Sequence, residues 1–253
     1  MNPAPNPLVI QFTAALPNIG PTRSRAGRSV FRSVGFRHLR ATAPPPTPLY
    51  TQGPMNSPYR YSPPSAGGIN RGGRVYPVNP PPGLNPLASG DFVFPGLYAA
   101  EDPETAYVES NQEVMALVRA RFPSPHIPAM TVLGLEVGTT RLDLLDLTQR
   151  AVQAQLGLTR ADLLQEWQPF NYPGPGLTGG WAPTQILGYL VYQDTRFQGV
   201  RYPSARNRGR PCVFIFTDKL VRGTHRITVG DDPNPPPPRQ PAQCCGLALQ
   251  TIP

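Results

Sequence analysis

The sequence GLYAAEDPETAYVE, residues 96–109, decides how we interpret the fold. Residues 97–100 form a short apolar run after a Pro-Gly break, which is typical of a buried strand. Residues 102–104 then supply an N-cap aspartate, a first-turn proline and a first-turn glutamate. The pattern predicts a strand that leads directly into a helix beginning at Asp102. Glu109 lies about two turns into this helix, which we expect to end near Arg121.

Hydrophobic patterns elsewhere predict further elements, with strands and helices in separate groups. Because regular β-α-β alternation is absent from this order, the pattern favours an α+β fold. The strands expected at residues 130–137 and 142–147 are interpreted as neighbours in the sheet. Strands are expected at residues 130–137, 142–147, 199–202 and 212–217, and helices at residues 159–166 and 183–193.

Proline is concentrated towards the two ends of the chain and in one loop. The sequence has 36 prolines among 253 residues, about three times ordinary usage. Residues 1–54 are rich in Pro, Arg and Ser with weak periodicity, so we expect them to be disordered. We expect the same of the Pro-rich tail, residues 229–253. One folded domain is expected over residues 55–228. Its Pro-rich loop, residues 75–97, is either a lid or an insertion.

Charge is distributed unevenly along the chain. Residues 1–90 contain nine basic and no acidic residues, whereas residues 91–253 contain fourteen basic and fifteen acidic ones. The net charge of +8 therefore comes from the first part, and the folded domain is close to neutral. This argues against nucleic-acid binding by the domain itself. A non-catalytic protein that uses a basic arm, residues 1–54, to bind nucleic acid or an acidic surface stays an alternative.

Targeting and metal signals are weak. The apolar residues 7–16 have no basic residue before them and arginines after them, the reverse of a secretory signal. We favour a disordered extension, with an organellar transit peptide or a true start at Met55 as alternatives. No apolar run reaches the ~18–20 residues needed to cross a bilayer. The three cysteines and three histidines are scattered, so we expect a cytoplasmic protein with no metal site and no membrane partner.

Four short blocks follow one another in a recognisable order. They are Arg60-Tyr61, Gly73-Arg74, residues 97–109, and Tyr202-Pro203-Ser204-Ala205-Arg206 before an apolar strand. Over about residues 57–220 the chain resembles the RES-domain family, the toxin components of bacterial toxin–antitoxin pairs that deplete NAD. The resemblance implies an ADP-ribosyltransferase-like fold, in which a split mixed β-sheet with flanking helices holds NAD+ in a cleft.

The resemblance also implies a role for each motif residue. Glu109 would be the catalytic carboxylate and Tyr98 would pack against the nicotinamide end, while the arginines would hold the pyrophosphate. Arg74 lies 24 residues before Tyr98, where the family has about ten, so Arg71 is an alternative to it. The implied catalytic residues are Glu109, Tyr98 and Arg74, and the implied substrate-binding residues are Arg60, Tyr61, Arg74, Tyr98 and Ser204.

The implied reaction is cleavage of the bond between nicotinamide and ribose, with NAD+ as substrate and no cofactor. A carboxylate that faces the anomeric carbon stabilises the oxocarbenium-like transition state more than the ground state. Because nicotinamide is already a cationic leaving group, no strong general acid is required. Water as acceptor gives a glycohydrolase, inorganic phosphate a phosphorylase, and a protein side chain an ADP-ribosyltransferase. The implied partner is an antitoxin protein that neutralises the enzyme.

Overall fold

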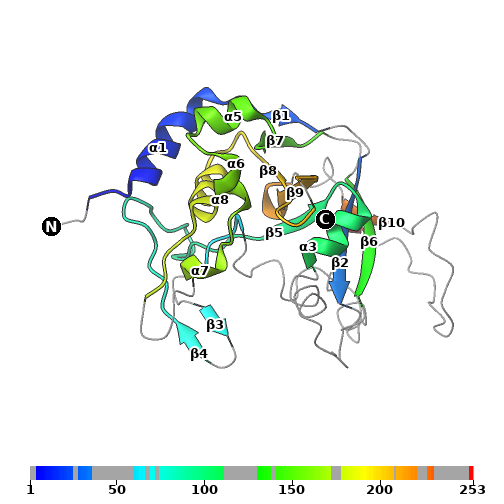
Figure 1. Cartoon of the computed structure of the whole chain (residues 1–253), viewed down its shortest axis with the longest axis horizontal. Coiled ribbons are helices and arrows are strands. Elements are labelled where there is room, and N and C mark those ends of the chain that lie inside the picture. Colours follow the sequence, from blue (N-terminus) through cyan, green and yellow to red (C-terminus); the bar gives the residue numbers. More distant parts are fainter. Residues whose placement is uncertain are drawn as a thin grey trace.

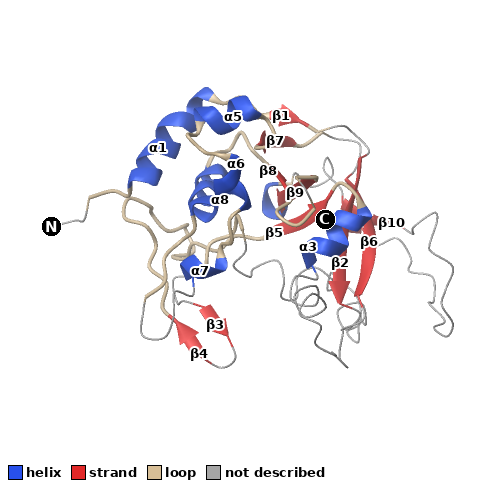
Figure 2. Cartoon of the chain, in the orientation of Figure 1, coloured by secondary structure: helices blue, strands red, loops and turns tan. Residues whose placement is uncertain are grey.

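The helices and strands of the chain form one α+β unit around a mixed β-sheet (Figures 1 and 2). Helices gather mainly beside one half of the sheet, while α3 (Pro103–Ser110) packs against the other. The computed structural model describes residues 4–24, 28–35, 60–65, 69–71, 74–110, 130–137, 141–171, 178–207, 209–220, 227–230 and 251–252.

The described strands of the main sheet lie in the order β1-β7-β8-β9-β5-β2-β6-β10-β11. Among these pairs, β7 and β8 run parallel and the others are antiparallel. Along the sheet the bounds are Thr22–Arg23, Asp143–Asp146, Gly199–Pro203, Pro211–Phe216, Gly96–Ala100, Arg28–Gly35, Met130–Val137, Ile227–Gly230 and Thr251–Ile252.

The sheet is divided between β5 and β2. These two strands share one register pair, Phe31 with Ala100, whereas β2 and β6 pair along the whole of both strands. One half therefore contains β1, β7, β8, β9 and β5, and the other contains β2, β6, β10 and β11. This arrangement confirms the predicted α+β fold with a split mixed sheet. A hairpin of β3 (Ile69–Arg71) and β4 (Arg74–Tyr76) forms a separate small sheet.

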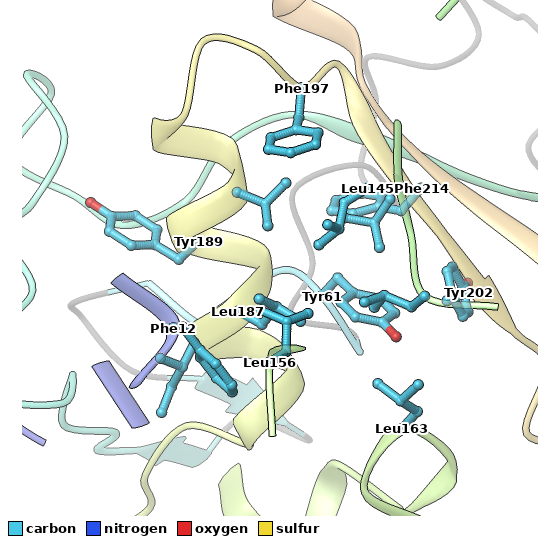
Figure 3. Close-up of a cluster of buried hydrophobic side chains, with 14 of the residues drawn as sticks. Phe12, Tyr61, Leu145, Leu156, Leu163, Leu187, Tyr189, Phe197, Tyr202 and Phe214 are labelled. Carbon is cyan, nitrogen blue, oxygen red and sulfur yellow. The ribbon is translucent and has the colours of Figure 1, made fainter. Parts of the chain in front are cut away.

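The hydrophobic core surrounds α8 (Pro183–Gln193), which covers the first half of the sheet (Figure 3). Leu187 and Tyr189 of α8 are fully buried, as are Leu145 of β7 and Phe214 of β9. Shorter elements close the core around it. These are α1 (Pro7–Ala15), η1 (Leu16–Asn18), α5 (Arg150–Gln155), α6 (Arg160–Leu164), α7 (Gln168–Asn171) and η3 (Thr217–Lys219).

Most strands and helices expected from hydrophobic patterns are present. Strands β6, β7, β8 and β9 and helices α6 and α8 lie within two residues of their expected bounds. The expected pairing of residues 130–137 with residues 142–147 is wrong, because β6 pairs with β2 and β10 whereas β7 pairs with β1 and β8. The helix expected from Asp102 is described as far as Ser110, and the rest of it lies outside the described residues.

Residues 1–54 are called the leader below. The expectation that the leader is disordered is wrong for residues 4–24 and 28–35. Pro7 starts α1 after an Asn6 cap, whose side chain accepts a hydrogen bond from the Leu8 amide at 2.9 Å. The buried residues of this segment follow helical spacing and pack into the core, and β2 lies between β5 and β6. The high proline content of the segment masks this periodicity in the sequence. Residues 36–54 lie outside the described residues. The buried residues in and just after α1 and η1 are Val9, Phe12, Leu16 and Ile19.

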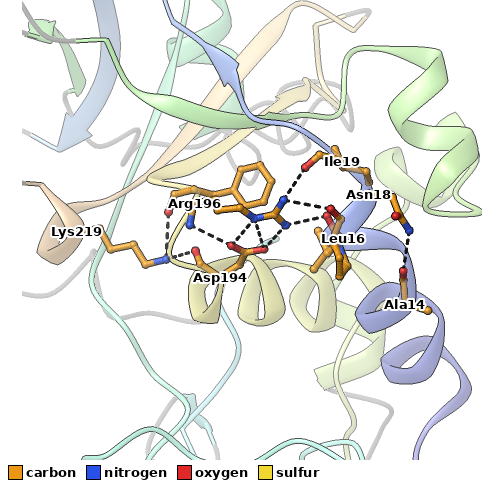
Figure 4. Close-up of polar contacts among 9 residues, drawn as sticks. Ala14, Leu16, Asn18, Ile19, Asp194, Arg196 and Lys219 are labelled. Carbon is orange, nitrogen blue, oxygen red and sulfur yellow. Dashed lines mark hydrogen bonds and ion pairs between the residues drawn. The ribbon is translucent and has the colours of Figure 1, made fainter.

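Arg196 fastens the leader to the end of α8 (Figure 4). Its Nη2 donates to the Leu16 carbonyl at 2.9 Å and its Nη1 to the Ile19 carbonyl at 3.2 Å. The same guanidinium forms a double hydrogen bond with Asp194, at 3.0 Å from Nε to Oδ1 and 2.6 Å from Nη2 to Oδ2. Arg196 thus joins the backbone of η1 and Ile19 to Asp194 through charge-assisted hydrogen bonds.

The Pro-rich loop before β5 packs onto the same core. Val78 bridges to Gly179, and Phe92 and Phe94 are buried. The Tyr189 hydroxyl donates to the Asn85 carbonyl at 2.6 Å. The loop is therefore an integral part of the packed structure. Of the C-terminal tail, Thr251–Ile252 pairs with β10, and residues 231–250 lie outside the described residues.

Lys219, the single lysine of the chain, lies beside the end of α8. Its Nζ donates to the carbonyls of Asp194 and Phe197 at 2.8 and 3.1 Å and lies 5.1 Å from the centroid of the Tyr192 ring. Burial lowers the pKa of this amine to about 8, against the attraction of Asp194 and Asp218.

The described helices include none that is long and apolar enough to span a membrane.

The pKa of Lys219 can be measured without ambiguity, because 13C-labelled lysine gives one Cε signal. We expect its chemical shift to titrate with a midpoint near pH 8. Since the unfolded-state pKa of 10.5 is higher, the unfolded chain binds the proton more tightly between these values. The free energy of unfolding should therefore rise with pH over this window. A midpoint at the ordinary lysine value, about 10.4, would contradict the account.

Candidate active site

Two motif blocks meet at one edge of the sheet because of strand direction. Strands β5 and β8 are both antiparallel to β9, so they run parallel to each other and end at the same edge. At this edge β5 leads into α3, which carries Glu109, and β8 leads into a turn that begins with Ser204. Residues about a hundred positions apart are thereby brought together.

The start of α3 is fixed by Asp102. Its Oδ1 accepts a hydrogen bond from the Thr105 amide at 2.8 Å, and its Oδ2 accepts one from the Thr105 hydroxyl at 2.7 Å. The predicted N-cap at Asp102 is therefore formed. Because the helix start is fixed, so is the position of Glu109 along the helix.

Glu109 is held by the turn that follows β8. The Ser204 hydroxyl donates to Glu109 Oε1 at 2.5 Å, and the Arg206 amide lies 3.4 Å from the same oxygen. Ser204 is 1% exposed, whereas Glu109 is partly exposed. Both hydrogen bonds reach Oε1, and none of the described residues donates to Oε2. The carboxylate is thus oriented through one of its oxygens.

Tyr98 lies in the middle of β5, where it pairs with Phe214 of β9. Its ring stacks on Phe214 with centroids 4.0 Å apart. Its hydroxyl accepts a hydrogen bond from the Tyr61 amide at 2.9 Å and lies 3.0 Å from the Ser62 hydroxyl. The structure therefore joins Tyr98 to the segment that contains Arg60 and Tyr61.

Arg60 and Tyr61 are both buried. Arg60 is 3% exposed, and its Nη1 donates to the carbonyls of Leu163 and Gln165 at 2.6 and 2.8 Å. Tyr61 is fully buried with its ring 4.7 Å from that of Tyr202. Burial raises the pKa of Tyr61 far above its usual value; the positive charge of Arg60 opposes this and the negative charge of Glu109 adds to it. Arg60, Tyr61 and Glu109 are therefore electrostatic neighbours.

Tyr61 provides a test of what this block contributes. Its hydroxyl is buried, and the described residues supply no hydrogen-bond partner for it. Tyr61→Phe is therefore expected to raise the free energy of unfolding by about 1 kcal/mol, because an unpaired polar group leaves the core. Urea denaturation measures this change. A loss of stability would contradict the account, and an increase in KM for NAD+ would support the substrate-binding role that the resemblance implies.

The arginines of the Gly-Arg block are placed elsewhere. Arg71 and Arg74 pair with each other across the β3–β4 hairpin. Figure 1 shows this hairpin below α7 and well apart from α3. The side chains of both arginines lie outside the described residues. Their role in holding pyrophosphate stays a prediction.

A partly buried ion-pair network, which the motifs did not indicate, lies near the same strand ends. Arg201 donates to both carboxylate oxygens of Glu101, at 2.7 and 3.1 Å, and to Asp146 at 3.0 Å. Burial would raise the pKa of Asp146, but hydrogen bonds from Thr148 and Gln149 and the charge of Arg201 hold that pKa below its usual value. Ion pairs thus connect the ends of β5 and β7 to β8, beside the helix that carries Glu109.

Within the described part of the chain, no group of histidine, cysteine or acidic residues is arranged to hold a metal ion. The residues that meet at the edge are instead a carboxylate, hydroxyls and a guanidinium. Such groups can bind the hydroxyls and phosphates of a nucleotide by hydrogen bonding and charge.

The structure thus combines a split α+β sheet with a glutamate that is hydrogen-bonded where β5 and β8 end. A family model described as the RES domain matches residues 40–235. The chain belongs to the RES-domain family, which confirms the resemblance based on the four motif blocks.

Among solved structures, the chain is similar to the M. tuberculosis MbcT-MbcA toxin-antitoxin complex, with 18% sequence identity and a TM-score of 0.48, over 87% of this chain and 88% of that chain. No curated protein matches the chain.

Proposed function

We propose that the protein cleaves the nicotinamide–ribose bond of NAD+, with Glu109 as the catalytic carboxylate. The observation that carries this proposal is the orientation of Glu109, whose Oε1 is bound by Ser204 and Arg206. The second oxygen can then accept a hydrogen bond from a ribose hydroxyl. Membership of the RES-domain family supports NAD+ as the substrate.

The mechanism rests on charge. As the bond to nicotinamide breaks, positive charge develops on the ribose, and a fixed carboxylate stabilises that charge without reorganising. The neutral nicotinamide leaves with the bonding electron pair, so no proton has to be supplied to it. Tyr98, whose ring is supported by Phe214, is proposed to pack against the nicotinamide end. Arg60 supplies positive charge near the site for the phosphates.

The biological role that follows is that of a cytoplasmic toxin which depletes NAD+ and is neutralised by an antitoxin. Family membership and the site chemistry support this role. The acceptor of the ADP-ribosyl group is proposed to be water or inorganic phosphate. The basic-arm alternative loses part of its basis, because residues 4–24 and 28–35 belong to the packed fold.

Product analysis tests the proposal. The full-length chain is incubated with NAD+ carrying a label in the adenylate group, in buffer alone, with phosphate, and with a cell lysate as protein acceptor. Free nicotinamide with ADP-ribose or its 1-phosphate is expected. Label attached covalently to a lysate protein would instead identify an ADP-ribosyltransferase, and intact NAD+ in every arm would contradict the proposal.

A further inference from the structure

The turn after β8 contacts one face of α3 at two levels. Thr105 and Glu109 are four residues apart on α3, so their side chains lie one above the other. The Asn207 Nδ2 donates to the Thr105 hydroxyl at 2.8 Å, and the Ser204 hydroxyl donates to Glu109 at 2.5 Å. Two hydrogen bonds on successive helical turns fix both the height and the rotation of the helix relative to the turn.

Ser204 uses its full hydrogen-bonding capacity within the protein. Besides donating to Glu109, its oxygen accepts from the amides of Arg206 at 3.1 Å and Asn207 at 2.9 Å. A hydroxyl has one proton to donate and two lone pairs to accept with, so none is left for a ligand. In this arrangement Ser204 orients Glu109, which differs from the ligand contact that the family resemblance implies.

Thr105 is equally committed. It is completely buried, donates its proton to Asp102 Oδ2 at 2.7 Å and accepts from Asn207. Because the Asp102 carboxylate also caps the helix, the bond from Asn207 attaches the turn to the most firmly fixed part of α3. Buried hydrogen bonds of this kind are strengthened by the low local dielectric and are expensive to break.

The geometry points to Thr105 and Asn207 as positioning residues that hold the turn of Ser204 against α3 and so align the Glu109 carboxylate for catalysis. This inference rests on the proposed function of Glu109. Neither side chain has to touch the substrate. Loss of their hydrogen bond leaves Glu109 and Ser204 in place in the sequence but frees the turn to shift relative to the helix.

Steady-state kinetics of nicotinamide release test the inference in the full-length protein. Asn207→Ala removes the side-chain bond to Thr105 and keeps the backbone bond to Ser204, while Thr105→Val removes the hydroxyl at nearly constant volume. Each is expected to lower kcat by about 10- to 100-fold, because small displacements of a reacting group have effects of this size. KM for NAD+ should change by less than about threefold. Thr105→Ser, which keeps the hydroxyl, should recover most of kcat.

The controls separate positioning from general loss of structure. Asn18→Ala removes an exposed asparagine bond to the Ala14 carbonyl, 3.2 Å long, and should leave kcat unchanged. The double variant Thr105→Val with Asn207→Ala should be no slower than Thr105→Val, because that single variant already loses the hydrogen bond from Asn207 together with the bond to Asp102. Additive losses, an unchanged kcat, or a Thr105→Ser variant as slow as Thr105→Val would overturn the inference.

A wild-type protein that releases no nicotinamide would contradict the proposed function. The contact between the turn and α3 can then still be tested by amide hydrogen exchange. In Asn207→Ala, the Arg206 and Asn207 amides are expected to exchange faster while those of β9 keep their protection. Unchanged exchange of these two amides would overturn the inference independently of any activity.

Discussion

A chain that lacks residues 1–54 is expected not to fold. Strand β2 pairs with both β5 and β6, so its removal separates the two halves of the sheet. Helix α1 also contributes buried side chains, each worth about 1.5–3 kcal/mol, against a total stability of roughly 5–15 kcal/mol for a domain. Circular dichroism and gel filtration of residues 55–253 measure the outcome. A compact, cooperatively unfolding fragment would contradict the account.

Point variants in α1 test the same claim in graded form. Phe12 is fully buried, and Phe12→Ala is expected to lower the free energy of unfolding by about 3–5 kcal/mol. Ile10 lies on the same helix and is 57% exposed, so Ile10→Ala should change stability by less than about 0.5 kcal/mol. Equal effects of the two changes would show that α1 does not pack as described.

Glu109→Gln is expected to lower kcat for NAD+ cleavage on the order of 10²–10³-fold without loss of folding. The amide keeps the size and can still accept the Ser204 hydrogen bond, but it lacks the charge that stabilises a developing oxocarbenium ion. Steady-state nicotinamide release gives kcat, and the thermal midpoint shows that the variant is folded.

Glu104→Gln is the matched control for this substitution. Glu104 lies on the same helix, in its first turn, and is exposed. Its substitution removes the same charge as Glu109→Gln but at a residue that does not bind Ser204. Its kcat should equal that of the wild type. Equal losses in the two variants would assign the effect to the general charge of α3 and contradict the role of Glu109.

The sequence predicts the parts of the site that depend on local order. The Asp102 cap and the apolar run before it place Glu109 on a helix that follows a strand, and the Tyr-Pro-Ser block ends another strand. Family resemblance then assigns both blocks to one site. The structure places Glu109 and Ser204 in hydrogen-bonding contact.

Contacts that depend on strand order are beyond the local pattern. Nothing in residues 28–35 alone indicates that they lie between β5 and β6, because that position depends on pairing with residues far along the chain. The Arg201 network and the bond from Asn207 to Thr105 likewise join segments about fifty to a hundred residues apart. Helical spacing of buried residues in the leader was the one available local signal, and a high proline content concealed it.

The central claim, cleavage of NAD+ at a Glu109-centred site, is tested most directly by 1H NMR of NAD+ incubated with the full-length protein. The account predicts that the nicotinamide ring signals of NAD+ are replaced by those of free nicotinamide, at a rate that Glu109→Gln lowers on the order of 10²–10³-fold and Glu104→Gln leaves intact. Unchanged NAD+ signals with folded wild-type protein, with and without phosphate, would contradict it.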